Sequence, residues 1–286
     1  MRTIKRLAII LMALLVALCA ALWVPAAAQA EVSALFINVG KADSALLFLG
    51  ERRYLVDTGT KDSYDQLESV LRAFEVTRLD GVILTHTDKD HVGGLNQLLK
   101  SDIEVDRVYA GTLHSEKSLE DHPVYKTTQK RGAALSWLSA GDELEAGQGC
   151  TFWVLGPLTQ DNDKENNNSL VLLLTTPEGD MLLTGDMELP EEAELLAAGA
   201  FSQVDVLKVA HHGQDDATSE AFVNIVRPQW AVISTSTAEK PSTPDDGVVE
   251  SLLRAGAGVA VTQDAQVGIL ITLSGGVATA QSVQWP

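Results

Sequence analysis

The sequence predicts an α/β fold with a mixed β-sheet core and helices outside it. Short apolar runs rich in β-branched residues alternate with stretches of helical periodicity along most of the chain, a pattern typical of α/β architectures. No stretch has the composition of an interdomain linker, and the most polar segment, residues 161–168, is too short to separate domains. We therefore expect a single domain over residues 31–286.

The first thirty residues differ from the rest and are predicted to be a secretory signal peptide. Three basic residues within the first six precede the apolar run Leu7 to Val24, and the small residues Ala28-Gln29-Ala30 follow. This order matches a signal peptide that is cleaved after Ala30, which places the protein outside the cytoplasm. The alternative is an uncleaved membrane anchor, because the apolar run approaches the length that crosses a bilayer.

Charge and cysteine content restrict the partners and the sources of stability. The formal net charge is −18 at pH 7, and removal of the signal segment, which carries three basic and no acidic side chains, makes it −21. Such a surface repels nucleic acid and anionic lipid at long range, although a soluble extracellular protein has the same character. Cys150 is the one cysteine after residue 30. Stability must therefore come from packing, helped by any bound metal.

The first elements of the domain are expected to be three strands, a helix and a fourth strand. Strands over Val32 to Val39, Ser44 to Leu49 and Tyr54 to Val56 should form an antiparallel meander, because only turn residues separate them. A helical pattern covers Tyr64 to Phe74, and an apolar strand covers Gly81 to Thr85.

The second half of the chain continues the alternation. Strands over Ser169 to Thr175 and Met181 to Thr184 are separated by Pro177-Glu178-Gly179-Asp180, which suits a turn. The remaining expected elements are, in order, helix Pro190 to Ala198, strand Val204 to Ala210, helix Ser219 to Val226, strand Ala231 to Ser234, helix Gly247 to Ala255, and strands around Val259, Ile269 and Val277.

Four of the six histidines lie in two clusters, each at the end of an expected strand. His86 and His91 follow one strand, and His211 and His212 follow a later one. Ligands of open α/β sheets gather at strand ends, where loops project side chains from a rigid base. The two clusters could therefore meet in space.

The loop that begins at His86 has the composition of a metal site. It reads His86-Thr87-Asp88-Lys89-Asp90-His91, which places two imidazoles and two carboxylates within six positions. Both groups are ligands of zinc, manganese and iron. Alternation along the loop should separate His86 and Asp88 from Asp90 and His91, which suits two neighbouring metal ions. A solvated turn is the alternative, but this spacing directly after a buried strand favours metal.

This loop resembles the His-x-His-x-Asp-His signature of the metallo-β-lactamase fold, with Asp88 in place of the second histidine. Further motifs resemble the ComEC-type DNA-internalisation proteins of that fold, in the same order, over essentially all of the chain after residue 30. The resemblance implies a four-layer αββα sandwich with mixed sheets. The motifs are Phe36-Ile37-Asn38-Val39-Gly40-Lys41-Ala42-Asp43-Ser44, similar to D-V-G-Q-G-D with Asn38 and Lys41-Ala42 as departures; Leu55-Val56-Asp57-Thr58-Gly59; Asn167-Asn168-Ser169-Leu170-Val171-Leu172; Leu183-Thr184-Gly185-Asp186; and Leu207-Lys208-Val209-Ala210-His211-His212-Gly213.

The resemblance implies two divalent metal ions and assigns their ligands. His86 and Asp88 would hold the first ion, Asp90 and His91 the second, and Asp186 would bridge the two. The Gly-Asp turn alone is weak evidence, because an ordinary β-turn is its commoner meaning. Since carboxylates are numerous in this set, Mn²⁺ rivals Zn²⁺ as the natural metal.

The same resemblance suggests roles for residues around the ions. His212 would complete the second ion, which leaves His211 facing the substrate. Asp57 would orient a ligand histidine through a hydrogen bond, although an ordinary turn aspartate has the same appearance. Asn168 and Ser169 would position a substrate oxygen, or alternatively would cap the polar loop.

Two departures from the family pattern affect the expected site. Many members supply a further histidine between the first cluster and the Gly-Asp turn, where this chain offers Glu165 and asparagines, so the first ion would bind weakly. The family also shows Gly-His-Pro before the last helix, where this chain reads Glu239-Lys240-Pro241. Lys240 could act as a cation near a phosphoryl oxygen, but an exposed surface lysine is the simpler explanation.

The resemblance implies an exported metal-dependent hydrolase, first of all a phosphodiesterase or nuclease. Two metal ions that share a hydroxide provide a nucleophile at neutral pH, and Asp90 would hold or deprotonate that water. We expect a phosphate-ester substrate, with single-stranded DNA as one candidate, whereas the acidic charge argues against tight duplex binding. Membrane contact is expected only through an uncleaved N-terminal segment. Alternatives are hydrolysis of a phosphocholine ester, lactone or β-lactam, or a secreted binding protein with a degenerate metal site.

Overall fold

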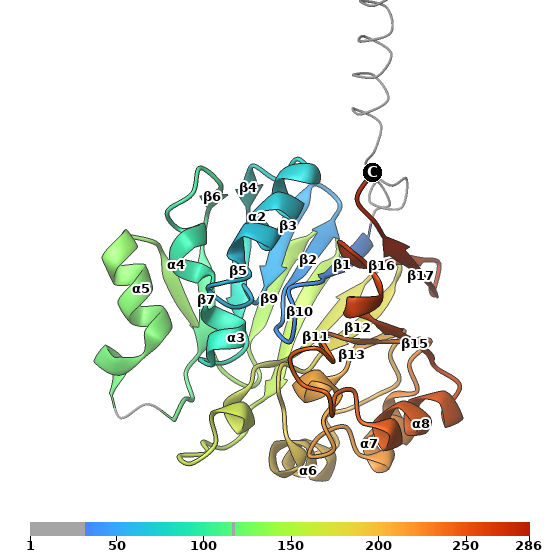
Figure 1. The fold of residues 1–286 in the computed structure, drawn as a ribbon. Coiled ribbons are helices and arrows are strands. Elements are labelled where there is room, and N and C mark those ends of the chain that lie inside the picture. The colour runs from blue at the N-terminus through green and yellow to red at the C-terminus, as the bar shows by residue number, and fades with distance from the viewer. Residues whose placement is uncertain (1–31, 116–117) are drawn as a thin grey trace, which may run out of the picture.

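The computed structural model describes residues 32–115 and 118–286 (Figure 1). The expected signal segment, residues 1–30, lies outside the described residues. None of the helices in the described ranges combines the length and the apolar character that crossing a bilayer requires.

Two β-sheets face each other at the centre of the molecule. The eight-stranded sheet has the order β17-β16-β1-β2-β3-β5-β7-β8, and the seven-stranded sheet has the order β15-β14-β13-β12-β11-β10-β9. The first sheet consists of β1 (Val32–Ile37), β2 (Ala45–Leu49), β3 (Arg52–Val56), β5 (Gly81–Leu84), β7 (Val108–Gly111), β8 (Leu135–Leu138), β16 (Gly268–Ser274) and β17 (Val277–Val283). The second consists of β9 (Glu143–Gly147), β10 (Cys150–Gly156), β11 (Val171–Thr176), β12 (Gly179–Leu183), β13 (Val206–Lys208), β14 (Trp230–Ile233) and β15 (Gly258–Val261).

Helices cover the outer face of each sheet, which confirms the four-layer αββα sandwich. One apolar cluster joins the first sheet to its helices, and another joins the second sheet to the remaining helices. The first set is α2 (Tyr64–Ala73), α4 (Leu95–Leu98) and α5 (Pro123–Arg131), and the second is α6 (Leu189–Ala197), α7 (Glu220–Val226) and α8 (Asp246–Arg254). The short elements are α3 (Lys89–Val92) and the pair β4 (Arg78–Leu79) with β6 (Glu104–Val105).

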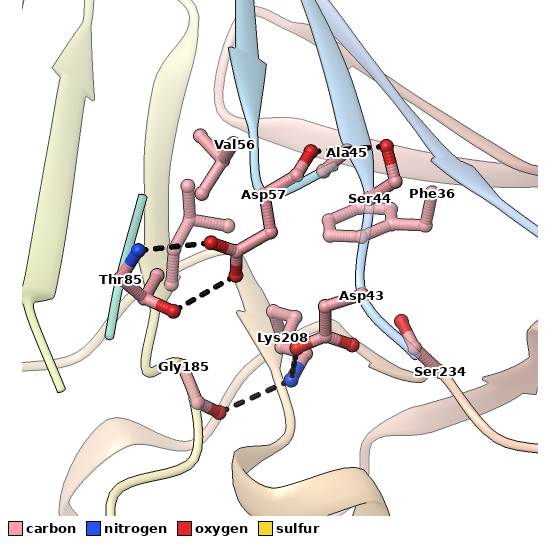
Figure 2. A pocket seen from close by; sticks show the side chains of 11 residues that line it. Phe36, Asp43, Ser44, Ala45, Val56, Asp57, Thr85, Gly185, Lys208 and Ser234 are labelled. Carbon is pink, nitrogen blue, oxygen red and sulfur yellow. Dashed lines mark hydrogen bonds and ion pairs between the residues drawn. The ribbon is translucent and has the colours of Figure 1, made fainter. Parts of the chain in front are cut away.

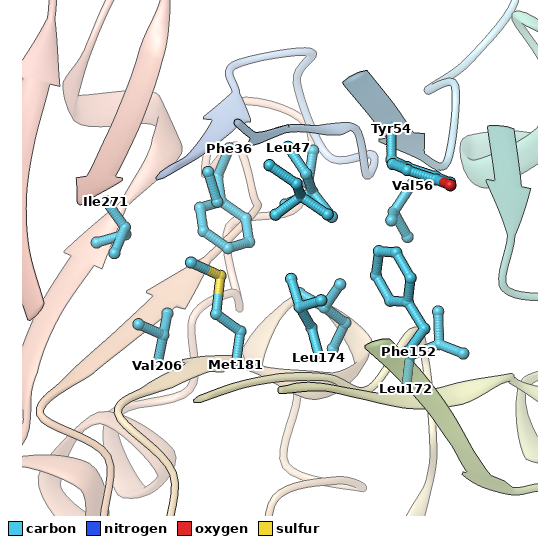
Figure 3. Close-up of a cluster of buried hydrophobic side chains, with 14 of the residues drawn as sticks. Phe36, Leu47, Tyr54, Val56, Phe152, Leu172, Leu174, Met181, Val206 and Ile271 are labelled. Carbon is cyan, nitrogen blue, oxygen red and sulfur yellow. The ribbon is translucent and has the colours of Figure 1, made fainter. Parts of the chain in front are cut away.

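Strands β1, β2 and β5 of the first sheet are buried on both faces, which explains their largely apolar sequences. In β1, Leu35 and Ile37 pack toward the helices, whereas Phe36 packs between the sheets, as the two-residue period of a strand requires. Phe36 meets a layer from both sheets that includes Phe152 and Met181 (Figure 3). Side chains buried on both faces fix the register, because a slip of one residue would exchange the two layers.

The pairing pattern agrees with the meander expected from the sequence. Strands β1, β2 and β3 pair as antiparallel neighbours, and β3 then pairs with β5 in parallel. In the second sheet, β11 and β12 form a hairpin, and β12, β13 and β14 run parallel. The carboxyl ends of these parallel strands carry the loops that contain the candidate ligands.

Helix α6 buries a carboxyl group that makes no well-formed hydrogen bond. Glu191 is 3% exposed, and neither of its carboxyl oxygens has a partner. Burial, and then the nearby charge of Glu194, raise the pKa of Glu191 well above its usual range. The stabilising contribution of this neutral acid is complete below the pKa of the unfolded chain and is lost as pH rises toward the folded pKa.

We expect the free energy of unfolding of Glu191→Gln to rise relative to that of the parent protein between pH 5 and pH 7. The rise should be about 1.4 kcal/mol for each pH unit that lies between the pKa of Glu191 in the unfolded chain and its pKa in the folded protein. Urea unfolding at several pH values measures this difference. The exposed Glu250→Gln on α8 is the matched control and should show no such trend. A constant difference between Glu191→Gln and parent across this range would contradict an un-ionised Glu191.

Candidate metal centre

The candidate ligands come from loops at the carboxyl ends of parallel strands in both sheets. The loop after β5 carries His86 to His91, the turn after β12 carries Asp186, and the turn after β13 carries His211 and His212. The chain reverses tightly at the last pair, where both histidines have positive φ. The two histidine clusters, more than a hundred residues apart in sequence, therefore meet across the sandwich.

Four side chains converge on one point in this region. The Nε2 atoms of His91 and His212 each lie 3.2 Å from Asp186 Oδ2, and His212 Nε2 lies 3.4 Å from Asp90 Oδ2. One ligand atom from each of the four residues lies within 4.8 Å of the other three. Ligands about 2.0–2.1 Å from a tetrahedral ion are about 3.3 Å apart. The cluster therefore has the dimensions of a site for one divalent ion.

Several buried atoms in the cluster have no hydrogen-bond partner. They are Nε2 of His86, Nε2 of His91, Nε2 of His212 and Oδ1 of Asp186. Unpartnered buried polar atoms are uncommon in folded proteins, and each one calls for an explanation such as a missing ion. Because these atoms are the metal-binding atoms of their side chains, the residues present fit a divalent metal.

The other nitrogen of each ligand histidine is held by a specific acceptor. His91 Nδ1 lies 2.8 Å from Asp57 Oδ2, and Asp57 in turn accepts hydrogen bonds of 2.8 Å from the backbone nitrogen and the hydroxyl of Thr85. His212 Nδ1 donates to the carbonyl oxygen of Ser234 at 2.9 Å. These bonds fix the ring orientation and leave Nε2 free to bind metal. The contact of Asp57 is the one expected from the sequence.

Electrostatics show that the cluster concentrates negative charge. Burial lowers the pKa of His212, but the carboxylates of Asp186 and Asp90 outweigh burial and raise it to about 9. Burial likewise opposes the charged form of His91, yet Asp186 and Asp57 raise its pKa well above the usual range. In contrast, burial and the charge of His91 lower the pKa of His86 to about 4. Without metal, protons on His91 and His212 supply the positive charge that a cation would supply.

His86 and Asp88 lie beside the four-residue cluster. The ring of His86 is 4.1 Å from that of His91 between centroids, and His86 Nε2 is 3.9 Å from Asp88 Oδ2. His86 is buried, whereas the side chain of Asp88 is 49% exposed. This pair can offer two ligands to a second ion, next to Asp186.

Glu165 holds the loop of residues 86–91 in place through hydrogen bonds. Its Oε1 accepts hydrogen bonds from the backbone nitrogen and the hydroxyl of Thr87, and its Oε2 accepts one from the backbone nitrogen of Ser115. Between the two motifs the chain also carries two histidines, His114 and His122, so the expectation of Glu165 and asparagines alone was wrong. These two rings meet edge to face, with their centroids 4.7 Å apart, and His122 also accepts a hydrogen bond from the backbone nitrogen of Tyr125 at the start of α5.

His211, Asn168 and Ser169 lie outside the four-residue cluster. His211 Nδ1 lies 2.7 Å from Asp216 Oδ1, in a separate group with Glu188. Asn168 is buried and bonds to both backbone atoms of Asp161, so it caps the polar loop, the second alternative considered for it. The Ser169 hydroxyl accepts a hydrogen bond from the backbone nitrogen of Asp186 at 3.1 Å and thus helps to position that carboxylate.

A buried lysine that the sequence did not single out lies directly beneath the cluster. Lys208, at the end of β13, is 5% exposed, forms an ion pair with Asp43 and donates to the carbonyl oxygen of Gly185 (Figure 2). Its Nζ is 3.8 Å from Asp186 Oδ1. Burial opposes its charge, but Asp43 and Asp186 outweigh burial and raise its pKa. The sequence feature that could have identified this residue is a lysine at the end of an otherwise apolar strand.

Comparison with known proteins agrees with this geometry. The family model described as "Metallo-beta-lactamase superfamily" matches residues 37–236. The chain is 32% identical over 238 residues to ComE operon protein 3 of Bacillus subtilis (strain 168), which covers 76% of this chain and 30% of that protein. It is 30% identical over 222 residues to Recombination protein 2 of Haemophilus influenzae, covering 76% of this chain and 26% of that protein.

A solved structure supports the fold at low sequence identity. The crystal structure described as a metal-dependent hydrolase of the beta-lactamase superfamily superposes with a TM-score of 0.54 and 15% identity, covering 88% of this chain and all of that one. By contrast, the chain spans less than a third of the length of the two sequence relatives.

Proposed function

The chain belongs to the metallo-β-lactamase superfamily of metal-dependent hydrolases, and on this basis we propose that it hydrolyses phosphodiester bonds outside the cytoplasm. The proposal rests on the convergence of two imidazole rings and two carboxylates, with distances of 3.2–3.4 Å between the ring Nε2 atoms and the carboxylate oxygens. The Nε2 atoms of both rings have no hydrogen-bond partner. The similarity to a protein named for recombination favours a phosphodiester, with single-stranded DNA as a candidate. The net charge of −18 argues against tight binding of duplex DNA.

The proposal includes two divalent ions, Zn²⁺ or Mn²⁺. Bound ions would increase the acidity of a water molecule and offset charge on the phosphoryl oxygens of the substrate. Asp90 would accept a proton from the attacking water, and His211 would face the substrate. One ion would be held by Asp90, His91, Asp186 and His212, and a weaker one by His86 and Asp88 with Asp186 shared.

A substrate screen under controlled metal content tests the proposal. The protein is stripped with a chelator, reloaded with Zn²⁺ or Mn²⁺, and assayed with bis-p-nitrophenyl phosphate, single-stranded DNA and nitrocefin. We expect metal-dependent hydrolysis of the first two and none of nitrocefin, because the lactam carbonyl that is attacked is neutral, whereas the attacked phosphoryl group carries a negative charge. Hydrolysis of nitrocefin alone would overturn the proposal, and elemental analysis showing no stoichiometric metal would favour a binding protein.

Metal binding is expected to release protons, since an imidazole must be neutral to bind a metal. In the metal-free protein His212 has a pKa of about 9 and is therefore protonated at pH 7. Below that pKa, each fall of one pH unit should weaken the apparent affinity about tenfold per proton released. Calorimetry in two buffers of different ionisation enthalpy counts these protons, and we expect at least one at pH 7 for the ion held by His91 and His212.

The control for this count is His122→Asn. Burial lowers the pKa of His122 to about 4, so this ring is already neutral at pH 7. Asn can still cap the start of α5, and the variant should release the same number of protons as the parent. Proton release of zero in the parent would contradict the assignment of His212 as a ligand.

A further inference from the structure

A partly exposed lysine reaches the metal cluster from the solvent side. Lys41 Nζ lies 2.9 Å from Asp90 Oδ2, and the two side chains are 22% and 23% exposed. The same Oδ2 atom lies 3.4 Å from His212 Nε2. One carboxylate oxygen therefore faces both the ammonium group and the point where the four ligands converge.

The backbone around Lys41 is fixed on two sides. Its backbone nitrogen donates to Glu239 Oε1 at 3.3 Å, and a Cβ on the preceding Gly40 would overlap that same oxygen. Two residues further on, the backbone nitrogen of Asp43 donates to the carbonyl oxygen of Asp90 at 3.1 Å. The loop that carries Lys41 is thus hydrogen-bonded to the ligand loop, which keeps the ammonium group of Lys41 close to Asp90.

The position of Lys41 is unusual among the cations of the described ranges. Lys208 also lies within 4 Å of the cluster, but it is buried and paired with Asp43. Lys41, in contrast, is partly exposed to solvent and forms its ion pair with Asp90, a member of the cluster. Lys41 also stands where the resembling motif D-V-G-Q-G-D has Gln, so this charge is a feature of this chain.

We propose that Lys41 is the anion-binding residue of this site: it pairs with Asp90 in the metal-free protein and binds a phosphoryl oxygen of the substrate once metal is bound. A metal ion at Asp90 Oδ2 would repel the ammonium group, because like charges a few ångströms apart raise each other's energy. An anionic oxygen between the two cations is attracted to both. The assignment of a phosphate ester rests on the proposed function.

A cation beside the site also offsets the repulsion between the negatively charged chain and an anionic substrate. With a net charge of −18, the protein repels phosphate at long range. A lysine ammonium is a common phosphate ligand that acts as a point charge. Lys41 therefore makes the site selective for an anionic ester over a neutral lactone or lactam, and it is a specificity residue that contacts substrate.

The test compares Lys41→Gln, which restores the motif residue, with Lys41→Arg, which keeps the charge. Lys100→Gln removes the same charge from an exposed position outside the site and is the matched control. Calorimetry measures the affinity of each protein for Mn²⁺, and then the affinity of each Mn²⁺-loaded protein for inorganic phosphate. We expect Lys41→Gln to bind Mn²⁺ about two- to fivefold more tightly, the size of a partly exposed ion pair, and to bind phosphate at least roughly tenfold more weakly.

Lys41→Arg should keep phosphate affinity within about threefold of the parent, because the charge remains, and Lys100→Gln should match the parent in both measurements. Phosphate affinity of Lys41→Gln equal to that of the parent overturns the proposal, as does a parent protein that binds no phosphate. Neither measurement requires turnover. If phosphate binding depends on Lys41 but bis-p-nitrophenyl phosphate is not hydrolysed, the anion site stands and the phosphodiesterase assignment fails.

Discussion

Lys208→Met is expected to lower the free energy of unfolding by about 3–5 kcal/mol, the usual cost when one partner of a buried ion pair is removed. Met keeps most of the apolar volume of the side chain but removes the cation nearest to Asp43, which leaves His91 and His212 at 3.8 and 3.7 Å. Asp43 and Lys208 line a small cavity between the sheets together with Asp57 and Thr85 (Figure 2), and Asp43 is 4% exposed, so water has little access to its carboxylate. The loss should be measured in metal-free protein, so that bound metal does not add to the stability of the folded state.

Thermal unfolding by circular dichroism measures this effect. At about 2–4 °C per kcal/mol for a domain of this size, the expected loss corresponds to a decrease in Tm of roughly 6–20 °C. The double variant Asp43→Asn with Lys208→Met should recover part of the loss, because a neutral pair replaces an unpaired charge. The exposed Lys100→Met is the control and should match the parent. A decrease in Tm equal to that of the control would mean that the pair contributes no stability.

The elements predicted correctly from sequence are those whose apolar pattern reflects burial. Strands β1 and β5 are buried along their whole length, and their apolar runs are visible without any tertiary information. Residues 99–160 had no assignment, although β7 and β10 carry that signal, whereas β9 and α5 lack it. Strand β9 reads ELEAG and is largely exposed, and α5 reads PVYKTTQKR with two buried residues. Such elements are defined by pairing with neighbours and not by their own composition.

The site shows the same division between local and distant information. The ligand loop could be identified because its residues are adjacent in sequence, and the Gly-Asp and His-His turns follow apolar strands. Lys208 and Lys41 could not be assigned roles, because the carboxylates that they contact, Asp43 and Asp90, lie 165 and 49 positions away. The family pattern pointed instead to Lys240, which stands where the family shows the histidine of Gly-His-Pro. A lysine acquires such a role only when the fold brings carboxylates to it.

Asp90→Asn is expected to reduce kcat for bis-p-nitrophenyl phosphate by about 10²–10⁴-fold, the contribution of a positioned acid or base. Burial opposes the charged form of Asp90, but His212, His91 and Lys41 outweigh burial and hold its pKa well below the usual range, so the parent carries a carboxylate here. Asn has nearly the same shape and lacks both the charge and the ability to accept a proton from water. The substitution therefore removes the negative charge and the proton acceptor but changes the packing little.

The fold of Asp90→Asn should survive, and this separates a loss of chemistry from a loss of structure. Two ion pairs are lost, one with Lys41 at 2.9 Å and one with His212 at 3.4 Å. The side chains of Lys41 and Asp90 are 22% and 23% exposed, and pairs near the surface contribute about 0–1 kcal/mol. We therefore expect the metal-free variant to unfold within a few degrees of the parent, while turnover stays low even when added metal saturates the protein. The exposed Glu250→Gln, which removes one charge on α8, should keep full activity. Parental turnover by Asp90→Asn would show that another group takes the proton from the attacking water.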